Sequence, residues 1–453
     1  MDSSLIISIS GVRGIIGKSL TPELVTRFAS AFGTFVHGGK VVVGRDTRVS
    51  GAMIKHSVFA GLMSAGCQIV DLDIVPTPTC SLMVQELKAR GAVVISGSHN
   101  PIEWNALKFL RSDGIYLNNE QGKQLLDIYY QGNFRKVRWD KLMPVQEDNT
   151  SIERHLEKVI SVLDVEKIRK GKCKVVIDSC NGAGSIITPE LLRRLGCKVI
   201  SINCTPDGLF PHNPEPIFVH LEDLRRAVKK HKADIGFAQD ADADRVAIVN
   251  EKGEYLGEEY TLALAAMHIV KKRKGSIVAN LSTSRMIDDI AEMYGAEVIR
   301  TPVGEVNVAE AMLASKSIIG GEGNGGVIDP RVHYVRDSII GIGIILEEMV
   351  ETGKKVSGLA RQLPRYYMLK KKIECTGDVA NEIILALKEK HRDKKLNLTD
   401  GIRIDWKDKW VHIRPSGTEP ALRVIGEART QKDAYHLVTS FLREAQRIIK
   451  SHA

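Results

Sequence analysis

The chain has 453 residues, of which 43% are hydrophobic and 26% are charged, and its formal net charge is +9. This length exceeds what one hydrophobic core supports, so we expect about two to four domains. The cationic residues are dispersed, apart from the run at residues 271–274, and are not interleaved with aromatic side chains. This pattern argues against nucleic acid as a partner and favours anionic small molecules.

The cysteines and the apolar segments indicate the cellular compartment of the protein. Seven cysteines form no Cys-x-x-Cys pair, and their odd number indicates free thiols in a reducing compartment. Residues 1–10 contain a short apolar run without a basic region before it, so we expect no signal peptide. No apolar run reaches the ~18 residues of a transmembrane helix. The sequence therefore predicts a cytoplasmic protein with no membrane partner, and it carries no signal for oligomeric state.

Three stretches of the sequence share a strand-helix-strand pattern. Each begins with an apolar, β-rich run that ends in small and polar residues, at 40–51, 173–185 and 275–286. A helical pattern follows each run, at 52–64, 186–195 and 287–293, and ends near Gly66, Gly196 or Gly295. A second strand comes at once. Such units build parallel sheets that are buried on both faces, so the pattern predicts three related α/β domains with largely parallel sheets.

Each of these units closes with a third apolar strand and a polar loop, at residues 92–101, 233–245 and 317–326. Ligands of open α/β sheets bind at the carboxyl ends of strands, so we expect the three loops to meet at one central cleft. The remaining chain alternates polar and apolar residues, which predicts a smaller α+β domain with an antiparallel sheet. The expected domains are residues 1–150, 151–253, 254–365 and 366–453.

The second loop carries Asp240, Asp242 and Asp244, which share one face of an extended chain. Three close carboxylates repel one another unless a cation neutralises them. Mg²⁺ takes oxygen ligands and often keeps room for substrate oxygens, so the trio predicts a magnesium site, with a solvated acidic turn as the alternative. An EF-hand is excluded because Arg245 stands where that loop requires glycine. Arg245 is better suited to a phosphate beside the ion.

The segment RPSGTEP at residues 414–420 is a candidate phosphate site. Arg414 can bind an oxyanion through a bidentate fork. Ser416, Gly417 and Thr418 offer hydroxyl groups and an approachable backbone, which together form a small anion nest. An ordinary turn with a surface arginine is the alternative interpretation.

The glycine-rich segment GEGNGG at residues 321–326 lacks the Gly-Lys-Ser/Thr ending of a P-loop. Its polar side chains are Glu322 and Asn324. A carboxylate and an amide on a glycine loop suit sugar hydroxyls, which both donate and accept hydrogen bonds. A flexible turn is the alternative.

The first loop, in VVISGSHNP at residues 93–101, contains the candidate nucleophile Ser98. A serine needs a group that activates it, and no G-x-S-x-G elbow of an α/β-hydrolase is present. A serine that attacks phosphorus needs cations more than an oxyanion hole. His99 is then a hydrogen-bond donor to phosphate or a packed loop histidine. Lys108 is a point charge for phosphate or a surface lysine.

The segments SGSHNP, DADADR, GEGNGG and RPSGTEP, in this order and spacing, resemble those of the α-D-phosphohexomutase family. Its members include phosphoglucomutases, phosphomannomutases and phosphoglucosamine mutases. The segments GVRGIIG at 11–17 and GRDTRVSG at 44–51 also match, so the resemblance covers essentially the whole chain. It implies four domains around a central cleft, of which the first three are related in fold.

The resemblance also implies a reaction in which a phosphoryl group moves between C1 and C6 of a hexose or hexosamine phosphate. Ser98 is carried as phosphoserine, a hexose bisphosphate is the intermediate and activator, and Mg²⁺ is bound by the phosphoserine and the aspartate trio. The matching positions near the phosphoserine are Arg13, His99, Lys108 and Arg245. Those that match the sugar site are Glu322 and Asn324, and those that match the site of the non-reacting phosphate are Arg414, Ser416, Gly417 and Thr418.

The chain departs from the common family pattern at a few of these positions. Asn324 replaces a frequent serine, and Glu305 stands where some relatives carry His or Lys, which makes Glu305 a candidate substrate contact. The general acid or base stays open among Glu305, His99, Lys108 and His333. We expect a preference for glucosamine or mannose phosphate over glucose phosphate alone. The alternatives from other classes are a phosphoserine-dependent sugar phosphatase and a non-catalytic sugar-phosphate sensor.

Overall fold

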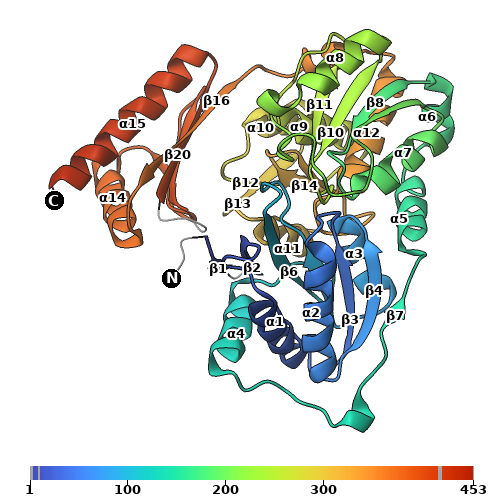
Figure 1. Ribbon diagram of the computed structural model, residues 1–453. Helices are drawn as coiled ribbons and strands as arrows, with labels where there is room; N and C mark the ends of the chain where they lie inside the picture. The colour runs from blue at the N-terminus through green and yellow to red at the C-terminus, as the bar shows by residue number, and fades with distance from the viewer. Residues whose placement is uncertain (1–3, 9–10, 417–420, 452–453) are drawn as a thin grey trace.

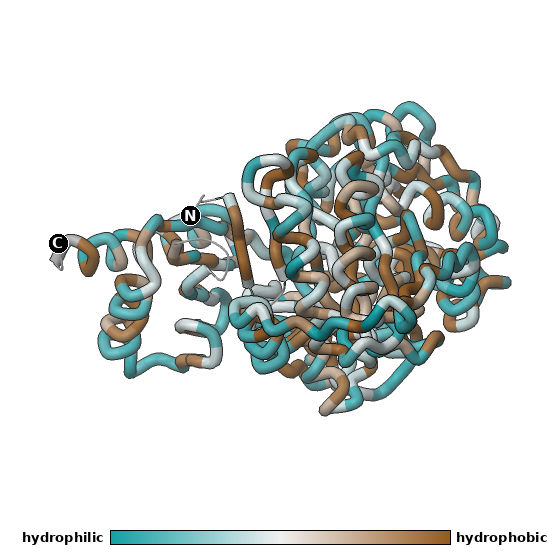
Figure 2. The backbone as a smooth tube through the Cα atoms, turned by 60° about the horizontal axis from the view of Figure 1, so that its bottom comes forward, coloured by the Kyte–Doolittle hydropathy of each residue, from teal (hydrophilic) through white to brown (hydrophobic). Residues whose placement is uncertain are grey.

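Four β-sheets follow one another along the chain in the computed structural model of the protein, which describes residues 4–8, 11–416 and 421–451. The first three sheets pack together with their helices, and the C-terminal domain stands to one side (Figure 1). The hydropathy of the backbone shows the same division, because apolar segments run through the interior of the larger body and alternate with polar ones in the smaller domain (Figure 2).

The first sheet has seven strands in the order β1-β2-β6-β5-β3-β4-β7. These are β1 (Ile6–Ser8), β2 (Gly11–Ile15), β3 (Lys40–Arg45), β4 (Gln68–Ile74), β5 (Gly91–Ile95), β6 (Trp104–Arg111) and β7 (Gln146–Glu147). The helices are α1 (Pro22–Phe35), α2 (Gly51–Ser64), α3 (Thr77–Glu86) and α4 (Asn119–Gln131). Alternate strand residues point to opposite faces, so Val41 and Val43 join the core under α1 and α2, while Val42 joins the core under α3.

The second and third sheets have four strands each, in the orders β11-β10-β8-β9 and β13-β12-β14-β15. The strands are β8 (Lys174–Asp178), β9 (Lys198–Ile202), β10 (Ile235–Gln239), β11 (Val246–Asn250), β12 (Ser276–Asn280), β13 (Glu297–Thr301), β14 (Ile319–Glu322) and β15 (Gly326–Ile328). The helices of the second sheet are α5 (Ser151–Ile160), α6 (Val165–Gly171), α7 (Gly184–Arg194) and α8 (Glu222–His231). Those of the third are α9 (Glu259–Lys272), α10 (Met286–Tyr294), α11 (Glu305–Ser315), α12 (Ser338–Thr352) and α13 (Val356–Ala360).

The same four-strand order recurs in all three sheets. In each, the first predicted strand pairs in parallel with the second and the third, and an antiparallel strand pairs with the other side of the third. This antiparallel strand is the edge of the second and third sheets, whereas in the first sheet β2 and β1 continue beyond it. The predicted helix ends are also present, because Gly66, Gly196 and Gly295 have φ of 78°, 74° and 68°, which a glycine adopts without steric cost. The prediction of three related α/β domains with largely parallel sheets is confirmed.

The second and third sheets share one hydrophobic core, which extends from Leu156 to Leu363. Helix α12 runs through this core, and its apolar residues are buried on every side, as its sequence of Ile, Gly, Leu and Met predicts. Two short 3-10 helices, at Trp139–Lys141 and Phe218–His220, complete the connections.

The C-terminal domain is an antiparallel sheet in the order β16-β20-β19-β18-β17, covered by two helices (Figure 1). Its strands are β16 (Tyr367–Glu374), β17 (Lys395–Asn397), β18 (Ile402–Asp405), β19 (Trp410–Pro415) and β20 (Ala421–Ala428), and its helices are α14 (Gly377–Lys390) and α15 (Gln431–Ser451). Alternate apolar residues of β18, β19 and β20 form the core beneath the helices. The predicted α+β domain is therefore confirmed.

Candidate active site

The three polar loops occupy equivalent places in their sheets, each between the third strand and the antiparallel strand that pairs with it. Ser98 follows β5, the aspartates follow β10, and Asn324 lies between β14 and β15. Equivalent loops of three related sheets were expected to meet at one cleft. The side chains around Ser98 show how the first two loops meet.

Ser98 has φ of 49°, a left-handed backbone conformation that costs about 1–3 kcal/mol in a residue other than glycine. Its Oγ lies 3.0 Å from Asp240 Oδ2 and 3.5 Å from His99 Nδ1. Its backbone N–H donates to Ser96 Oγ at 2.9 Å. The strained turn therefore directs the hydroxyl group of Ser98 toward the aspartates of the second sheet.

Arg48 holds this turn in place. Its guanidinium is fully buried and donates to the carbonyl oxygens of Ser98 at 2.8 Å and Asn100 at 2.7 Å. Asp46 balances the charge, since its Oδ2 accepts from Arg48 Nε at 3.1 Å and from Ser96 Oγ at 2.7 Å. One buried ion pair thus fixes the backbone on both sides of the serine.

Asp240, Asp242 and Asp244 are completely buried, and one oxygen of each lies within 4.8 Å of the others. Burial, together with the charges of the other two carboxylates, raises the pKa of Asp240 well above its usual range. Thr77, at the start of α3, donates through Oγ1 to Asp242 Oδ2 at 2.5 Å. The first domain therefore contacts the aspartate loop of the second through Ser98 and Thr77, and also through Lys108.

Three cationic side chains surround the aspartates. Lys108 Nζ lies 2.6 Å from Asp242 Oδ2, and Arg336 Nη2 lies 2.7 Å from Asp244 Oδ2. Arg245 is more distant, with its Nε 3.5 Å from Asp244 Oδ1. Although burial alone would raise it, these charges hold the pKa of Asp244 at about 2. Burial alone would lower the pKa of Lys108, but the carboxylates of Asp242 and Asp244 outweigh it and raise that pKa, so this lysine stays protonated.

The aspartate cluster fits a divalent cation. Oδ1 of Asp242 and Oδ1 of Asp244 are buried and have no hydrogen-bond partner within the described ranges. A buried oxygen without a partner costs free energy, which a metal ion offsets by binding it. Carboxylate oxygens from closely spaced aspartates are the ligands that Mg²⁺ prefers.

Glu322, Asn324 and Glu305 gather around Arg336. The Arg336 guanidinium contacts Glu322 Oε2 at 2.8 Å and Glu305 Oε2 at 3.0 Å, and its backbone N–H donates to Glu305 Oε1 at 2.7 Å. Asn324 Nδ2 donates to Glu322 Oε2 at 3.3 Å, while Oδ1 of Asn324 is buried without a described partner. Burial raises the pKa of Glu305 to about 7, although Arg336 opposes the shift. Arg336 thus connects the aspartate loop to the glycine-rich loop.

A cavity of about 300 Å³ lies where these groups meet. Eight of the predicted site residues line it: Arg13, Ser98, His99, Lys108, Arg245, Glu305, Glu322 and Asn324. The aspartates contact this wall through Ser98 and Lys108. The nearby Arg245, burial and Arg13 lower the pKa of His99 to about 2, so His99 is neutral near pH 7. The cavity is therefore rich in permanent positive charge at its serine end and in hydrogen-bonding groups at its other end.

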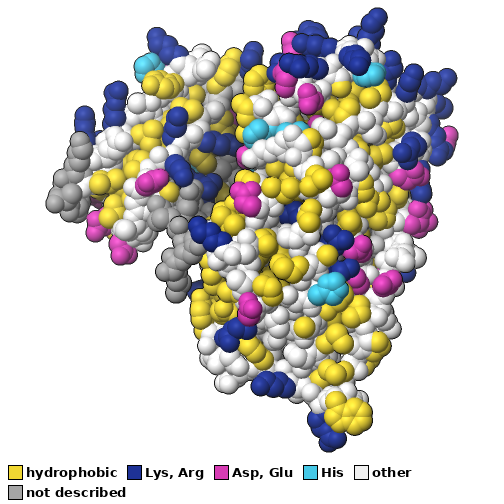
Figure 3. Space-filling view, in the orientation of Figure 1, with side chains coloured by type: hydrophobic (Ala, Val, Ile, Leu, Met, Phe, Trp, Pro, Cys, Tyr) yellow, Lys and Arg dark blue, Asp and Glu magenta, His cyan; other side chains and the backbone are white. Residues whose placement is uncertain are grey.

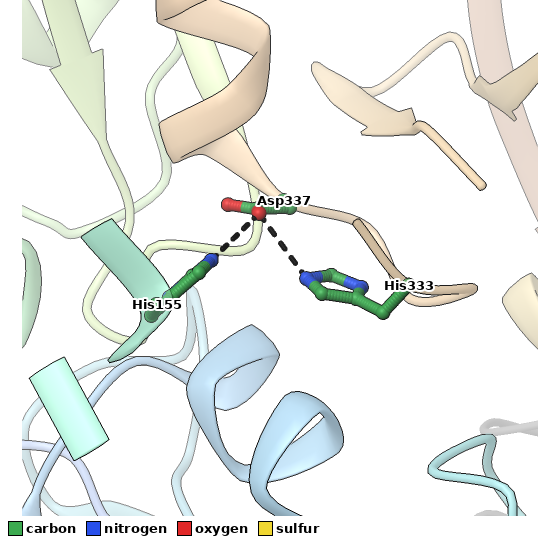
Figure 4. Close-up of side chains that lie close together, drawn as sticks. All are labelled: His155, His333 and Asp337. Carbon is green, nitrogen blue, oxygen red and sulfur yellow. Dashed lines mark hydrogen bonds and ion pairs between the residues drawn. The ribbon is translucent and has the colours of Figure 1, made fainter. Parts of the chain in front are cut away.

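His333 does not line this cavity and faces a separate buried network (Figure 4). Asp337 Oδ2 accepts from His155 Nε2 at 2.9 Å and from His333 Nε2 at 3.2 Å. The Val335 N–H donates to His333 Nδ1, which fixes the proton of that ring on Nε2. Thr79 Oγ1 lies 2.9 Å from His155 Nδ1, so the network joins all three α/β domains, and its Asp337 directly follows Arg336 in the chain.

Two predicted phosphate contacts of the C-terminal domain, Arg414 and Ser416, are not among the residues that line the cavity. The other two, Gly417 and Thr418, lie outside the described residues. Arg414 is nevertheless connected to the cavity. Its Nε donates to Asp400 Oδ2 at 2.8 Å, and the same oxygen accepts from the N–H of Val303, which lines the cavity, at 2.9 Å. A single carboxylate thus connects the predicted phosphate site with the loop that precedes Glu305.

The sequence did not reveal Arg48, Thr77, Arg336 or Asp400. Arg48 lies within a recognised segment and Thr77 lies near one. No local sequence pattern, however, shows that Arg48 anchors the turn of Ser98 or that Thr77 binds an aspartate. Arg336 follows a loop without a motif, and its three partners come from three distant segments. Only the segment GRDTRVSG, which contains Arg48, gave any signal that the region matters.

Comparison with known proteins identifies the family. Four phosphoglucomutase/phosphomannomutase domain models match the chain in order: alpha/beta/alpha domain I at residues 5–136, domain II at 153–253, domain III at 257–367 and the C-terminal domain at 374–444. Together they cover most of its length. The chain therefore belongs to the phosphoglucomutase/phosphomannomutase family, as its motifs indicated.

Individual relatives match over nearly the full chain. A phosphoglucomutase/phosphomannomutase of Thermococcus kodakarensis is 40% identical over 94% of each chain. A probable phosphoglucosamine mutase of Methanopyrus kandleri is 36% identical over 97% of this chain and 98% of its own. The crystal structure of a putative phosphomannomutase from Thermus thermophilus superposes with a TM-score of 0.83 at 26% identity, over 99% of this chain and 100% of that one.

Among the described residues, no helix is both long enough and apolar enough to span a membrane.

Proposed function

We propose that the protein is a Mg²⁺-dependent phosphohexomutase that moves a phosphoryl group between C1 and C6 of a hexose or hexosamine phosphate. The observation that carries this proposal is the 3.0 Å contact between Ser98 Oγ and Asp240, in a cavity that also contains Glu322 and Asn324. A nucleophile, a cation site and sugar-binding groups thus share one space. The named activities of the relatives support the same reaction.

Ser98 is the phosphoryl carrier in this proposal. The P–O bond to Ser98 Oγ breaks as a sugar hydroxyl oxygen bonds to phosphorus, and the proton of that sugar hydroxyl ends on Ser98 Oγ, which regains its hydroxyl group. The resulting bisphosphate reorients within the cavity, and its other phosphoryl group is transferred back to Ser98. Phosphoryl transfer depends mainly on positioning and on the stabilisation of spread negative charge. The permanent charges of Arg13, Lys108 and Arg245 supply that stabilisation around Ser98.

The three aspartates would hold the magnesium ion, together with an oxygen of phosphorylated Ser98. The ion, when bound, would neutralise the carboxylates and withdraw charge from the phosphoryl oxygens. Glu322 and Asn324 would bind sugar hydroxyls, and Glu305 would position Arg336 between the sugar and the aspartates. Arg414, Ser416, Gly417 and Thr418 would hold the phosphate that does not react. Because this one site would bind the non-reacting phosphate in both orientations of the bisphosphate, the phosphoryl group at either end can react.

Two assays test this proposal. The purified protein, given Mg²⁺ and a hexose 1,6-bisphosphate, should interconvert the 1- and 6-phosphates of at least one of glucose, mannose and glucosamine; we expect glucosamine or mannose phosphate to be preferred. Failure on the whole panel would overturn the proposal. Release of free phosphate in place of the isomer would indicate a phosphatase instead. We also propose a cytoplasmic location, because all seven cysteines are free thiols.

The variant Ser98→Ala separates the enzyme from a sugar-phosphate sensor. The enzyme should lose turnover in this variant, whereas a sensor would function without the hydroxyl group. Ser161→Ala is the matched control, because Ser161 is an exposed serine at the end of α5 whose hydroxyl group, among the described residues, donates only to Lys158 O.

A further inference from the structure

A second cavity, of about 600 Å³, lies at the contact between the third α/β domain and the C-terminal domain. Its walls come from the turn after β12, helix α10 and strand β13 on one side, and from β17, β18 and the turn after β18 on the other. None of its lining residues lines the candidate active site. Lys and Arg side chains are seen along the groove between the C-terminal domain and the larger body (Figure 3).

The wall of this second cavity carries more positive than negative charge. Its cationic side chains are Arg285, Arg300, Lys395, Arg403 and Lys407, and its acidic side chains are Asp288 and Asp405. Both domains contribute cations, so an anion in the cavity would contact both. The side chain of Arg403 is only 4% exposed and that of Arg300 only 13%, which means that water screens their charges weakly.

Part of this charge has a structural role. Arg403 forms a fork with Asp405, with its Nη2 2.8 Å from Oδ1, and it also donates to the carbonyl oxygen of Leu281. Arg300 Nη1 donates to the carbonyl oxygens of Asn280 and Thr283, both at 2.9 Å. These bonds hold the turn after β12. Each of these two arginines also has one carboxylate partner, Asp405 for Arg403 and Asp288 for Arg300.

The remaining charge has no carboxylate partner in the part of the chain that the structure describes, although the Arg285 guanidinium lies 6.0 Å from the centre of the Tyr366 ring. The guanidinium of Arg285 has no carboxylate within ion-pair distance there, and its Nη1 donates only to Trp406 O at 3.0 Å. The Nε atoms of Arg285 and Arg300 are buried without a hydrogen-bond partner. Burial and the nearby charge of Arg300 lower the pKa of Arg403, which indicates that the two guanidinium groups repel each other. Buried donors and uncompensated cations favour an anionic ligand.

We propose that this second cavity binds a small phosphorylated anion with two or more negative charges, and that the bound anion fastens the C-terminal domain to the third domain. Arg285 and Arg300 contact it from one domain, and Lys395, Arg403 and Lys407 from the other. The volume accommodates such an anion, and the indole of Trp406 supplies an apolar wall. The C-terminal domain also carries Arg414, so the second site would influence how that arginine reaches the proposed catalytic cavity.

Calorimetric titration of the full-length protein with inorganic pyrophosphate tests this proposal. The double variant Lys395→Gln/Lys407→Gln removes two exposed cations that have no role in the candidate active site, so its fold and its basal turnover should be unchanged. Lys388→Gln/Lys432→Gln is the matched control, because both lysines are exposed in the same domain and neither lines the cavity. The titrations are run at constant ionic strength, with chloride as the balancing anion.

We expect saturable binding to the wild-type protein and to the control variant, and binding at least about tenfold weaker in Lys395→Gln/Lys407→Gln. The melting temperature should rise with pyrophosphate in the first two proteins and much less in the third. Equal binding by all three proteins would overturn the proposal, as would heats that vanish when the ionic strength is matched. A further titration of Ser98→Ala should leave the second site intact, which separates this result from the fate of the proposed mutase activity.

Discussion

The buried network around Asp337 makes a strong prediction for the substitution Asp337→Asn. The carboxylate of Asp337 accepts from His155 and His333 through Oδ2, and from the N–H of Ile339 through Oδ1 at 2.7 Å. An asparagine has nearly the same shape, so no cavity is created. It has only one oxygen, however, and its amide group must face either the two imidazole donors or the backbone donor.

The structure sets the size of the effect. A hydrogen bond to a charged group contributes about 1.5–3 kcal/mol. If the amide oxygen faces the imidazole rings, the helix cap of α12 is lost; if it faces Ile339, two bonds are lost. The better orientation loses one such bond and weakens the two that remain, because their acceptor is no longer charged, so we expect a loss of about 2–4 kcal/mol. The second and third sheets share one core, and for a unit of that size the melting temperature falls by about 2–4 °C per kcal/mol.

Differential scanning calorimetry at pH 7 should show Asp337→Asn melting about 5–15 °C below the wild-type protein. Asp127→Asn is the control, since Asp127 is exposed in α4 and its side chain has no hydrogen bond or ion pair with the described residues, and it should melt within about 2 °C of wild type. His155 and His333 hold the pKa of Asp337 well below its ordinary value against the effect of burial. Its contribution is therefore complete above the unfolded pKa of about 3.9 and is lost as the pH falls toward the folded pKa. A variant that melts like wild type at pH 7 would refute the network.

Three further predictions concern the candidate active site. Lys108→Met removes the cation beside Asp242, so kcat should fall by about 10²–10³ while half-maximal activation needs less Mg²⁺; a higher Mg²⁺ requirement would contradict this electrostatic reasoning. Asp400→Ala removes the shared acceptor of Val303 and Arg414, so KM for the sugar phosphate should rise about tenfold or more in steady-state kinetics, and an unchanged KM would speak against a phosphate at Arg414. Glu305 has a raised pKa, and the folded protein therefore binds more protons than the unfolded one between about pH 4.3 and 7. As the pH rises through this window, the melting temperature of the wild-type protein should therefore fall relative to that of Glu305→Gln. If the melting temperatures of the two proteins change with pH in the same way, the raised pKa of Glu305 is ruled out.

The architecture could be predicted from the sequence because its signals are local and repeated. The Val/Ile runs, the helix that follows each run and the glycine that ends it recur three times, and each repeat reports the same strand order. The places of Ser98, the aspartates and Glu322 followed from the ends of the third strands. Periodicity and turn chemistry act over a few residues, so they are visible in one dimension.

The partners that hold the site together could not be predicted in this way. Arg48 supports Ser98 from a separate loop, and Arg336 contacts Asp244, Glu305 and Glu322 across distant segments. A cation that bridges several carboxylates resembles any surface arginine in the sequence. His333 shows the converse, because a histidine near the site's segments was a candidate acid or base, yet its ring faces Asp337 outside the cavity wall. These assignments depend on tertiary contacts alone.

The most direct measurement concerns the phosphate on Ser98. The wild-type protein is incubated with a hexose 1,6-bisphosphate and Mg²⁺, and the peptide that contains Ser98 is analysed by mass spectrometry before and after a sugar monophosphate is added. We expect that peptide to carry one phosphoryl group, to lose it to the added monophosphate, and to carry none in Asp240→Asn. Mutase turnover in Ser98→Ala, or turnover by a wild-type protein whose Ser98 never carries phosphate, would contradict the proposed role of this serine.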